Sequence, residues 1–335
     1  MTVTKHINLQ TFRDNLVSIV EQMKPARVMA VIKADAYGHG LVECAKEAAA
    51  LGIDILGVLD IETGLALRSV GVSTPAFAWL HSPISDFASA VDQGIELSAS
   101  SIEELEAIAK VPGKASIHLK IDTGLSRNGC RVEFWPTLVA RAIELQQAGE
   151  IQLVAVWSHL SGASIEADNK SKELFDAAID TAKELGFDGY RHLASSPGAF
   201  AYPDFRYDMV RIGVAAFGTS PVTGCSAKDF GLRNPMMVTA ELISPNTISI
   251  GYLHGYFSSL AGKSNVVIDG KKFAITKIDA LTSQIKTTDA QVGSVVRIFG
   301  DEDTDVTAEE LCDLVETVTD ELFTGLKTEL VSYSS

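Results

Sequence analysis

Val31-Ile-Lys-Ala-Asp-Ala-Tyr-Gly-His-Gly40 is the stretch of sequence that decides the fold. The run before it, Arg27-Val-Met-Ala-Val-Ile32, is apolar and β-branched enough to form a strand buried on both faces. Lys33 follows at the carboxyl end of that strand, where parallel α/β folds place their chemistry. A strand-end lysine is usually a solvated charge, but in a desolvated site its amine loses the proton and becomes a nucleophile. The stretch therefore predicts an α/β fold whose first buried strand presents one lysine either to solvent or to an electrophile.

Short apolar runs alternate with amphipathic segments between Arg27 and about Gly218. One of these segments opens with Ser101 and has Glu104 three residues later, which is the capping-box spacing of a helix start. Eight β/α units in about 190 residues predict a (β/α)8 TIM barrel. A doubly wound open sheet is the alternative, but the GxGxxG fingerprint that usually follows its first strand is absent there. The expected strands begin near Arg27, Ile53, Pro75, Ile95, Ala115, Ile151, Tyr190 and Met209.

After Asn234-Pro235 the pattern changes to short strands and turns. Asp269-Gly270 between two apolar runs is a strong signal for a β-hairpin. Thr307 and Glu310 have capping-box spacing, and the apolar residues that follow predict a helix continuing to Val318. We therefore expect a barrel domain at residues 1–234, followed by a smaller, mainly β domain with an acidic, helix-containing end at residues 235–335.

Composition narrows the class of partner. The formal charge of −15, from 28 basic and 43 acidic side chains, disfavours nucleic acid and anionic membranes as partners. No apolar run is long enough to span a membrane, and the N-terminus lacks the order of a signal peptide. The four cysteines lie far apart, without the spacing of a zinc site, and are interpreted as free thiols. We expect a cytoplasmic protein without a metal site.

Four further segments, taken with the opening stretch, resemble the alanine racemase family in that family's order and at close to its spacing. These segments are Lys120–Gly129, Trp157–Ser161, His192–Ser196 and Met209–Gly213. The resemblance implies a fold type III enzyme dependent on pyridoxal 5′-phosphate, in which Lys33 forms the internal Schiff base and acts as one base. The implied reaction interconverts L- and D-alanine. The implied assembly is a homodimer in which the partner's β domain completes each active site.

The same resemblance implies roles for other side chains at the predicted barrel mouth. Arg211 would face the pyridine nitrogen of the cofactor, and His159 would lie against the ring and hold Arg211 in place. Because an arginine does not give up its proton, it would keep that nitrogen unprotonated and weaken the ring as an electron sink. Arg127 matches an arginine near the cofactor's phenolic oxygen, and Lys120 matches a lysine that is carboxylated in some members. The implied phosphate cradle consists of Tyr37, Ser196, Gly213 and Val214.

The resemblance fails at the second catalytic base. The family's second base is a tyrosine in a Ser-Tyr-Gly-like segment, and that segment is absent here. Ile250–Tyr256 matches the motif that normally follows it, and Tyr252 or Tyr256 is left as a substitute base. Asp320 occupies the position of a tyrosine that reaches the cofactor phosphate. Two like charges ~4 Å apart would cost about 4 kcal/mol there at an effective dielectric constant of about 20.

Three functions stay open at this point. The first is an amino-acid racemase of the alanine type, and the second is a related enzyme that uses one base only on an amino acid. The third is a non-racemase barrel with a binding or regulatory role. The intact barrel motifs favour a cofactor-dependent isomerase acting on a small amino acid, because lysine, histidine and arginine are costly to bury together without a ligand.

Overall fold

The computed structural model describes residues 2–82 and 84–335, and the chain divides into two compact units. The first unit, which we call the barrel unit, comprises residues 19–33 and 45–213. The second, the β unit, comprises the N-terminal residues up to 18 together with residues 34–44 and 214–335. Each unit is therefore assembled from segments far apart in the sequence.

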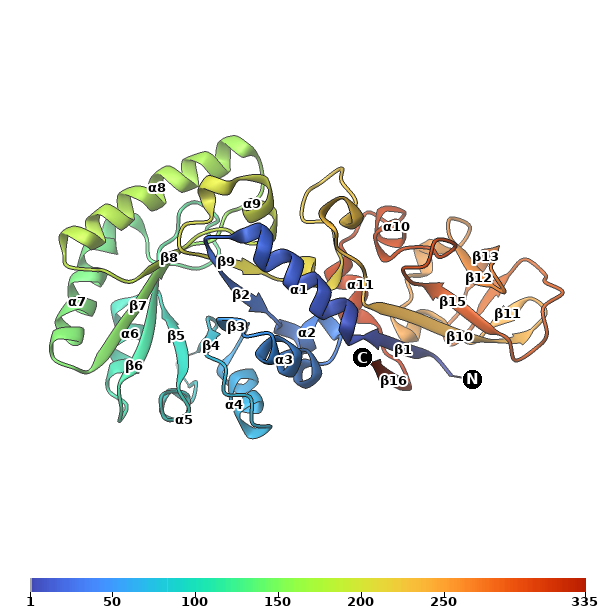
Figure 1. Ribbon diagram of the computed structural model, residues 1–335, viewed down its shortest axis with the longest axis horizontal. Coiled ribbons are helices and arrows are strands. Elements are labelled where there is room, and N and C mark those ends of the chain that lie inside the picture. Colours follow the sequence, from blue (N-terminus) through green and yellow to red (C-terminus); the bar gives the residue numbers. More distant parts are fainter. Residues whose placement is uncertain (1, 83) are drawn as a thin grey trace. The chain divides into compact units, whose positions relative to one another are not determined.

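The barrel unit contains an eight-stranded parallel sheet in the order β8-β7-β6-β5-β4-β3-β2-β9 (Figure 1). The two end strands, β8 and β9, are joined just beyond β8 by a parallel bridge between Ser195 and Arg211, so the barrel is nearly closed. All eight predicted strands are present, which confirms the predicted barrel. Their bounds are β2 (Arg27–Val31), β3 (Ile55–Val58), β4 (Ala76–Ala78), β5 (Ile95–Ala99), β6 (Ala115–Lys120), β7 (Ile151–Trp157), β8 (Tyr190–His192) and β9 (Met209–Ile212).

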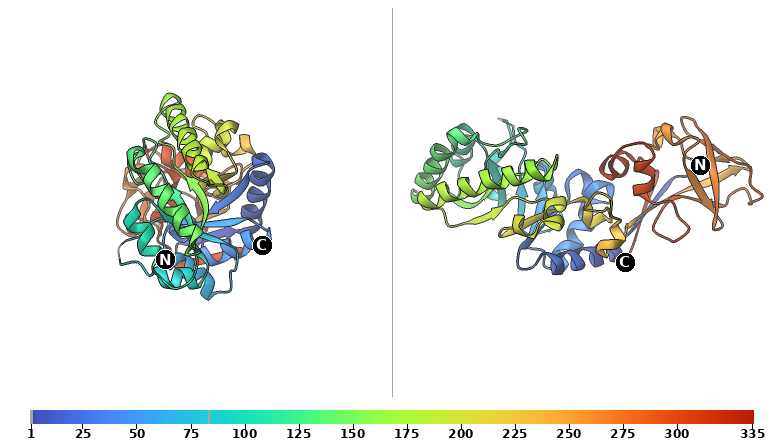
Figure 2. Two further views of the ribbon diagram at one scale, coloured as in Figure 1. Left: turned by 90° about the vertical axis from the view of Figure 1, so that its left-hand side faces the viewer. Right: turned by 90° about the horizontal axis from the view of Figure 1, so that it is seen from above.

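Helices alternate with these strands along the chain, and α7 and α8 cover the outer face of the sheet (Figures 1 and 2). Among the helix starts are four at which a side-chain oxygen accepts the N–H three residues on, which satisfies a backbone donor that the helix leaves free. These caps are Asp60, Asp86, Ser101 and Ser164. The helix predicted after Ser101 is therefore confirmed. The helices are α1 (Leu9–Met23), α3 (Leu41–Ala50), α4 (Ile61–Ser69), α5 (Phe87–Asp92), α6 (Ile102–Ala109), α7 (Trp135–Gln147), α8 (Ile165–Glu184) and α9 (Ser196–Ala201), with 3-10 turns η1 (Val132–Phe134) and η2 (Pro203–Phe205).

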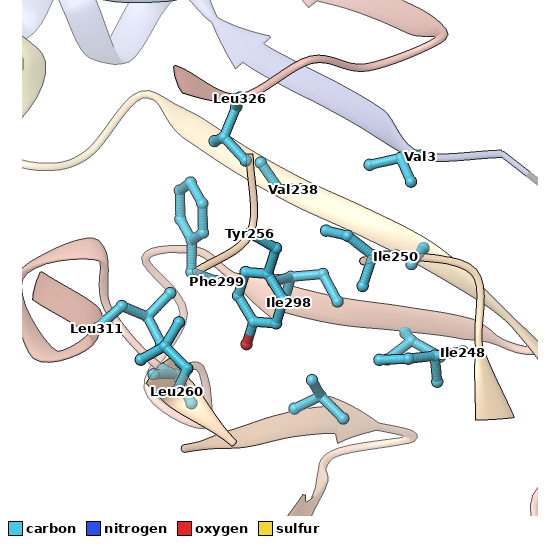
Figure 3. Close-up of a cluster of buried hydrophobic side chains, with 14 of the residues drawn as sticks. Val3, Val238, Ile248, Ile250, Tyr256, Leu260, Ile298, Phe299, Leu311 and Leu326 are labelled. Atoms are coloured by element: carbon cyan, nitrogen blue, oxygen red, sulfur yellow. The ribbon is translucent and has the colours of Figure 1, made fainter. Parts of the chain in front are cut away.

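The β unit contains a second eight-stranded sheet, in the order β11-β14-β13-β12-β15-β10-β1-β16. The N-terminal strand β1 pairs antiparallel with β10 and parallel with β16. A buried apolar cluster that includes Val238, Ile298 and Tyr256 forms its core (Figure 3). The strands are β1 (Thr4–Asn8), β10 (Met236–Ser244), β11 (Thr247–Ile248), β12 (Asn265–Ile268), β13 (Lys271–Ile278), β14 (Ser283–Ile285), β15 (Val295–Phe299) and β16 (Leu330–Ser334), with α10 (Ala308–Asp313), α11 (Thr319–Gly325) and the 3-10 turns η3 (Val214–Phe217), η4 (Ala227–Phe230), η5 (Tyr252–His254) and η6 (Ser258–Leu260).

The predicted hairpin at Asp269-Gly270 is confirmed. Ile268 pairs with Lys271, so the two residues between them form the whole turn. Asp269 has φ 49° and Gly270 has φ 75°. Positive φ at both central positions is the geometry of the tight turn that matches strand twist.

The predicted helix from Thr307 to Val318 is wrong beyond Asp313. Thr307 and Glu310 form the expected reciprocal cap, but α10 ends after one and a half turns. Glu316 has φ 57°, which takes the chain out of the right-handed helix, and α11 begins only at Thr319. The apolar residues that suggested a longer helix do not all face the core, since Leu314 is 38% and Val318 62% exposed. None of the helices in the described ranges could cross a membrane.

Candidate active site

Lys33 lies two residues beyond the end of β2 and is followed by a turn of left-handed helix. Residues 34–37 all have positive φ, between 51° and 56°. This conformation costs about 1–2 kcal/mol per L-residue, so the surrounding contacts must impose it. Asp35 Oδ1 accepts the N–H of Leu41 at 2.8 Å, and the Asp35 carbonyl accepts the N–H of Gly40 at 3.0 Å. The sequence analysis did not predict the left-handed conformation of this turn.

Arg211 is buried on β9, and its guanidinium is held in place by hydrogen bonds to four acceptors. Nη1 donates to Nδ1 of His192 at 2.9 Å, and Nη2 donates to Nδ1 of His159 at 3.0 Å. Nη2 also lies 2.9 Å from the carbonyl oxygen of Ser158 and 2.8 Å from that of Leu193. The structure thus brings together Arg211 and His159, the pair that the sequence linked. It also gives His192 a side-chain partner.

The charges of the barrel unit gather around His159. Burial first, and then the charges of Arg211, Arg127, Lys120 and Lys33, lower the pKa of His159 to about 2. The imidazole is therefore neutral at every ordinary pH. Burial lowers the pKa of Arg211 to about 9, so its guanidinium stays charged at neutral pH. Four cationic groups facing one neutral ring favour an anionic or electron-rich ligand.

Lys120, at the end of β6, is the second buried cation of the group. Burial, with the charges of Arg211 and Arg127, lowers the pKa of Lys120 to about 8. Its Nζ lies 4.3 Å from the ring centroid of Trp157, and Cζ of Arg211 lies 5.0 Å from the same centroid. The indole therefore partly offsets the repulsion between the two cations.

Two of the four predicted phosphate-cradle residues contact each other in the barrel unit. The N–H of Gly213, which follows β9, donates to Oγ of Ser196 at the start of α9, at 3.2 Å. The other two belong to the β unit, where Val214 opens η3 and Tyr37 is buried with its ring centroid 5.4 Å from that of Phe217.

Asp320 lies close enough to Tyr37, within the β unit, to act on its hydroxyl. Burial raises the pKa of Tyr37, and the charge of Asp320 on α11 raises it further. Asp320 stands where the family resemblance implies a tyrosine that reaches the cofactor phosphate. Its carboxylate therefore shares the local environment of Tyr37.

The two candidate second bases differ in accessibility. Tyr252, in η5, is 51% exposed, whereas Tyr256 is 1% exposed and packs in the core of the β unit (Figure 3). Burial raises the pKa of Tyr256, which makes it a poor base. The hairpin between β10 and β11 is closed by Pro245 and Asn246 alone, since Ser244 pairs with Thr247.

Sequence reasoning missed two polar residues inside the barrel. His118 on β6 is fully buried, and its Nε2 lies 2.7 Å from Oε2 of Glu96 on β5. His118 Nδ1 lies 3.0 Å from Nε2 of His192. The available signal was strand alternation, which places His118 on the same face of β6 as Lys120.

Comparison with known proteins identifies the family. The family models for the alanine racemase N-terminal and C-terminal domains match residues 7–221 and 237–333. The chain belongs to the alanine racemase family. The alanine racemase of Salinispora tropica is 36% identical to it over 273 residues, which are 78% of this chain and 72% of that protein.

Solved structures of the alanine racemase family match both units. The alanine racemase from D-cycloserine producing Streptomyces lavendulae has a TM-score of 0.95 at 27% identity, covering 100% of this chain and 97% of the other. The alanine racemase of Clostridium difficile 630, in complex with cycloserine, has a TM-score of 0.90 at 28% identity, covering 99% and 95%. The fold and the family that the sequence motifs indicated are thus confirmed.

Proposed function

We propose that this chain is a pyridoxal 5′-phosphate-dependent amino-acid racemase that interconverts L- and D-alanine. The observation that carries the proposal is the cluster of Arg211, His159 and Lys120 at the carboxyl ends of the barrel strands, in a chain of the alanine racemase family. The curated relatives named above are alanine racemases, and more than two thirds of the first relative's length is covered.

The side chains fit the cofactor group by group. The Lys33 amine suits an aldehyde, Arg211 supplies N–H donors for a pyridine nitrogen, and the small residues Ser196 and Gly213 leave room for a phosphate near backbone amides. When bound, the cofactor supplies the electron sink that makes the α-proton of an amino acid labile. Arg211 keeps its own proton, and His159 stays neutral and holds the guanidinium in place.

Lys33 and Tyr252 are the proposed proton-transfer groups on the two faces of the substrate α-carbon. Lys33 carries its amine just beyond the carboxyl end of the buried strand β2. Tyr252 is the exposed one of the two candidate tyrosines. The missing Ser-Tyr-Gly-like segment favours a second candidate function, a one-base enzyme, because that segment carries the family's second base. The two functions differ in whether both enantiomers lose their α-proton.

Deuterium exchange separates them. The protein is incubated in D2O with L-alanine and with D-alanine, and loss of the α-proton is followed by NMR. The proposed racemase exchanges both enantiomers, and Tyr252→Phe loses exchange from one of them. Tyr256→Phe, which alters a core hydroxyl, is the matched control and keeps both. Exchange of a single enantiomer by the unaltered protein would support the one-base enzyme, and exchange of both by Tyr252→Phe would exclude Tyr252 as a base.

Cofactor attachment is tested independently of turnover. We expect the protein with added pyridoxal 5′-phosphate to show a visible absorbance band that Lys33→Ala loses. Lys46→Ala, at an exposed position on α3, keeps it. Absence of the band in the unaltered protein would contradict the cofactor assignment.

We also propose that the chain acts as a homodimer and that residues 235–335 form most of a second domain, to whose sheet β1 contributes a strand. Leu253 and Leu281, beside Tyr252, are 58% and 52% exposed, and exposed apolar groups of this size favour a protein partner. Sedimentation of the unaltered protein and of Leu253→Glu tests the dimer, since the variant should shift the equilibrium toward monomer. A cytoplasmic location stays a prediction, which the free state of all four cysteines fits.

A further inference from the structure

A continuous chain of hydrogen bonds runs through the barrel unit from Arg211 to Glu96. Nη1 of Arg211 lies 2.9 Å from Nδ1 of His192, whose Nε2 lies 3.0 Å from Nδ1 of His118. Nε2 of His118 in turn lies 2.7 Å from Oε2 of Glu96. Four residues from four strands, β9, β8, β6 and β5, are thus connected in series.

The two end groups, Arg211 and Glu96, determine which ring nitrogen of each histidine carries the proton. Arginine can only donate, so Nδ1 of His192 must accept. A neutral His192 then carries its proton on Nε2 and donates to Nδ1 of His118. That nitrogen accepts, so the proton of His118 is on Nε2 and is donated to the Glu96 carboxylate, which can only accept. The opposite tautomer at either ring would place two donors or two acceptors face to face.

The surroundings keep the His192 imidazole neutral and hold both rings in place. His118 and His192 are each fully buried. Phe77 stacks on His118, with ring centroids 4.1 Å apart, and Trp157 stacks on His192, with centroids 5.5 Å apart. Burial first, and then the charge of Arg211, holds the pKa of His192 well below its usual range. In such low-dielectric surroundings an unpaired polar atom is costly. The donors and acceptors along the whole series of hydrogen bonds therefore reverse together or not at all.

The far end of the chain reaches the edge of the buried region. The Glu96 side chain is 19% exposed, and its carboxylate acts on the guanidinium of Arg68, which donates to the carbonyls of Val72 and Thr74. The carboxylate therefore has a cation, Arg68, in its neighbourhood. Its negative charge also compensates the buried charge of Arg211 through two polarisable rings.

We propose that Glu96 is a positioning residue for Arg211. By accepting from His118, its carboxylate sets the tautomers of both histidines, so that His192 always presents a lone pair to the guanidinium. One of the four acceptors that orient Arg211 is thereby kept in its accepting form by a side chain two histidines away. Only the consequence for turnover rests on the proposed function, because the tautomers and the orientation follow from the barrel unit alone.

The direct test is 15N NMR of histidine side chains in the full-length protein, with His118→Gln and His192→Gln used to assign the signals. We expect both rings to show the neutral Nε2–H pattern from pH 6 to pH 8. A neutral Nδ1–H pattern or a cationic ring at either position in the unaltered protein would overturn the proposal.

Substitution of Glu96 tests whether its carboxylate sets the tautomers of the two histidines. Glu96→Ala should lose the single tautomer pattern and lower kcat roughly 10-fold with little change in KM, the size typical when a functional side chain loses its outer partner. Glu96→Gln keeps an acceptor oxygen and should restore the pattern and most of kcat. Glu106→Ala, which removes a surface ion pair with Arg141, is the matched control and should change neither.

The outcomes separate the two proposals. Tautomers unchanged in folded Glu96→Ala would overturn the positioning role, whatever the cofactor does. If Glu96→Ala fails to fold, Glu96→Gln decides, because loss of the Nε2–H pattern in that variant would contradict the role of an acceptor at this position. A missing absorbance band in the unaltered protein, with the tautomers as expected, would overturn the proposed function and leave the role of Glu96 in orienting Arg211 intact.

Discussion

Asp320 is the residue that most distinguishes this chain from what its family resemblance implies. Its charge acts on Tyr37, a proposed phosphate ligand, and a phosphate bound there would face a carboxylate. We predict that Asp320→Asn binds pyridoxal 5′-phosphate at least about tenfold more tightly, which needs only about 1.4 kcal/mol of relieved repulsion. Titration of the cofactor-free protein by absorbance measures this. Glu321→Gln, on the next residue of α11, is the control, and equal affinities for Asp320→Asn and the unaltered protein would contradict the prediction.

Lys120 offers a second test at the scale of one side chain. Its pKa of about 8 is lowered by burial and by the charges of Arg211 and Arg127, whereas an ordinary lysine titrates near 10.4. A fraction of its amine is therefore unprotonated at neutral pH. We predict that acylation of Lys120, followed by mass spectrometry, rises with a midpoint near pH 8, below the midpoint of a lysine in a model peptide that is measured alongside. Parallel pH curves for the two lysines would show that the cations around Lys120 do not act on it.

At the scale of elements, the left-handed turn after Lys33 is a place where glycine should stabilise the protein relative to alanine, whereas in an ordinary helix it destabilises. Ala34 is exposed and has φ 52°, so its Cβ gains little packing and bears the left-handed penalty. Ala34→Gly should raise the free energy of unfolding by roughly 0.5–1 kcal/mol, because glycine adopts this conformation freely. Ala107→Gly, at an exposed site in right-handed α6, should lower it by about 1 kcal/mol. Urea unfolding checks both, and the same sign for both variants would contradict the turn's handedness.

Local patterns predicted the elements whose causes are local. Alternating apolar runs and capping residues such as Ser101 act over a few positions, and they gave the eight barrel strands and α6. The handedness after Lys33 could not be predicted, since alanine, aspartate and tyrosine all favour the right-handed helix and only the surrounding hydrogen bonds reverse it. Strand β1 was missed for a related reason, because its pairing partners β10 and β16 lie more than 200 residues away in the sequence.

The same division applies to the site at the scale of the whole molecule. Arg211 and His159 were predicted together because both lie in segments that resemble one family. Glu96 and His118 were not, since neither residue lies in a motif and their contact exists only when β5 and β6 are side by side. A sequence shows which residues can perform chemistry, whereas barrel closure decides which of them share a hydrogen-bonded chain.

Barrel closure and the packing of the β unit also bury histidines in both units, and this should make the stability of the whole molecule fall in mild acid. The pKa of His39 is lowered by burial to about 3 and that of His159 to about 2, and that of His192 is lowered as well. Below pH 6.5 the unfolded chain binds protons at these positions and the folded chain does not. Stability is therefore complete above pH 6.5 and is lost as pH falls toward the folded values, by about 1.4 kcal/mol per pH unit for each histidine.

Between pH 6.5 and pH 5 the three histidines together should lower the free energy of unfolding by up to about 4 kcal/mol per pH unit, partly offset by Glu309, whose pKa is raised by burial. His39 isolates one of the three contributions, because its Nδ1 lies 2.9 Å from the Tyr37 carbonyl and an asparagine amide can donate to the same oxygen. His39→Asn should unfold more easily at pH 7.5, because it loses ring packing against Phe217 and Phe323. The free energy of unfolding of this variant should depend less steeply on pH, by the equivalent of about one proton. Urea unfolding followed by far-UV circular dichroism at pH 5, 6 and 7.5 measures both effects. An unchanged slope would mean that His39 takes up its proton while the chain is still folded.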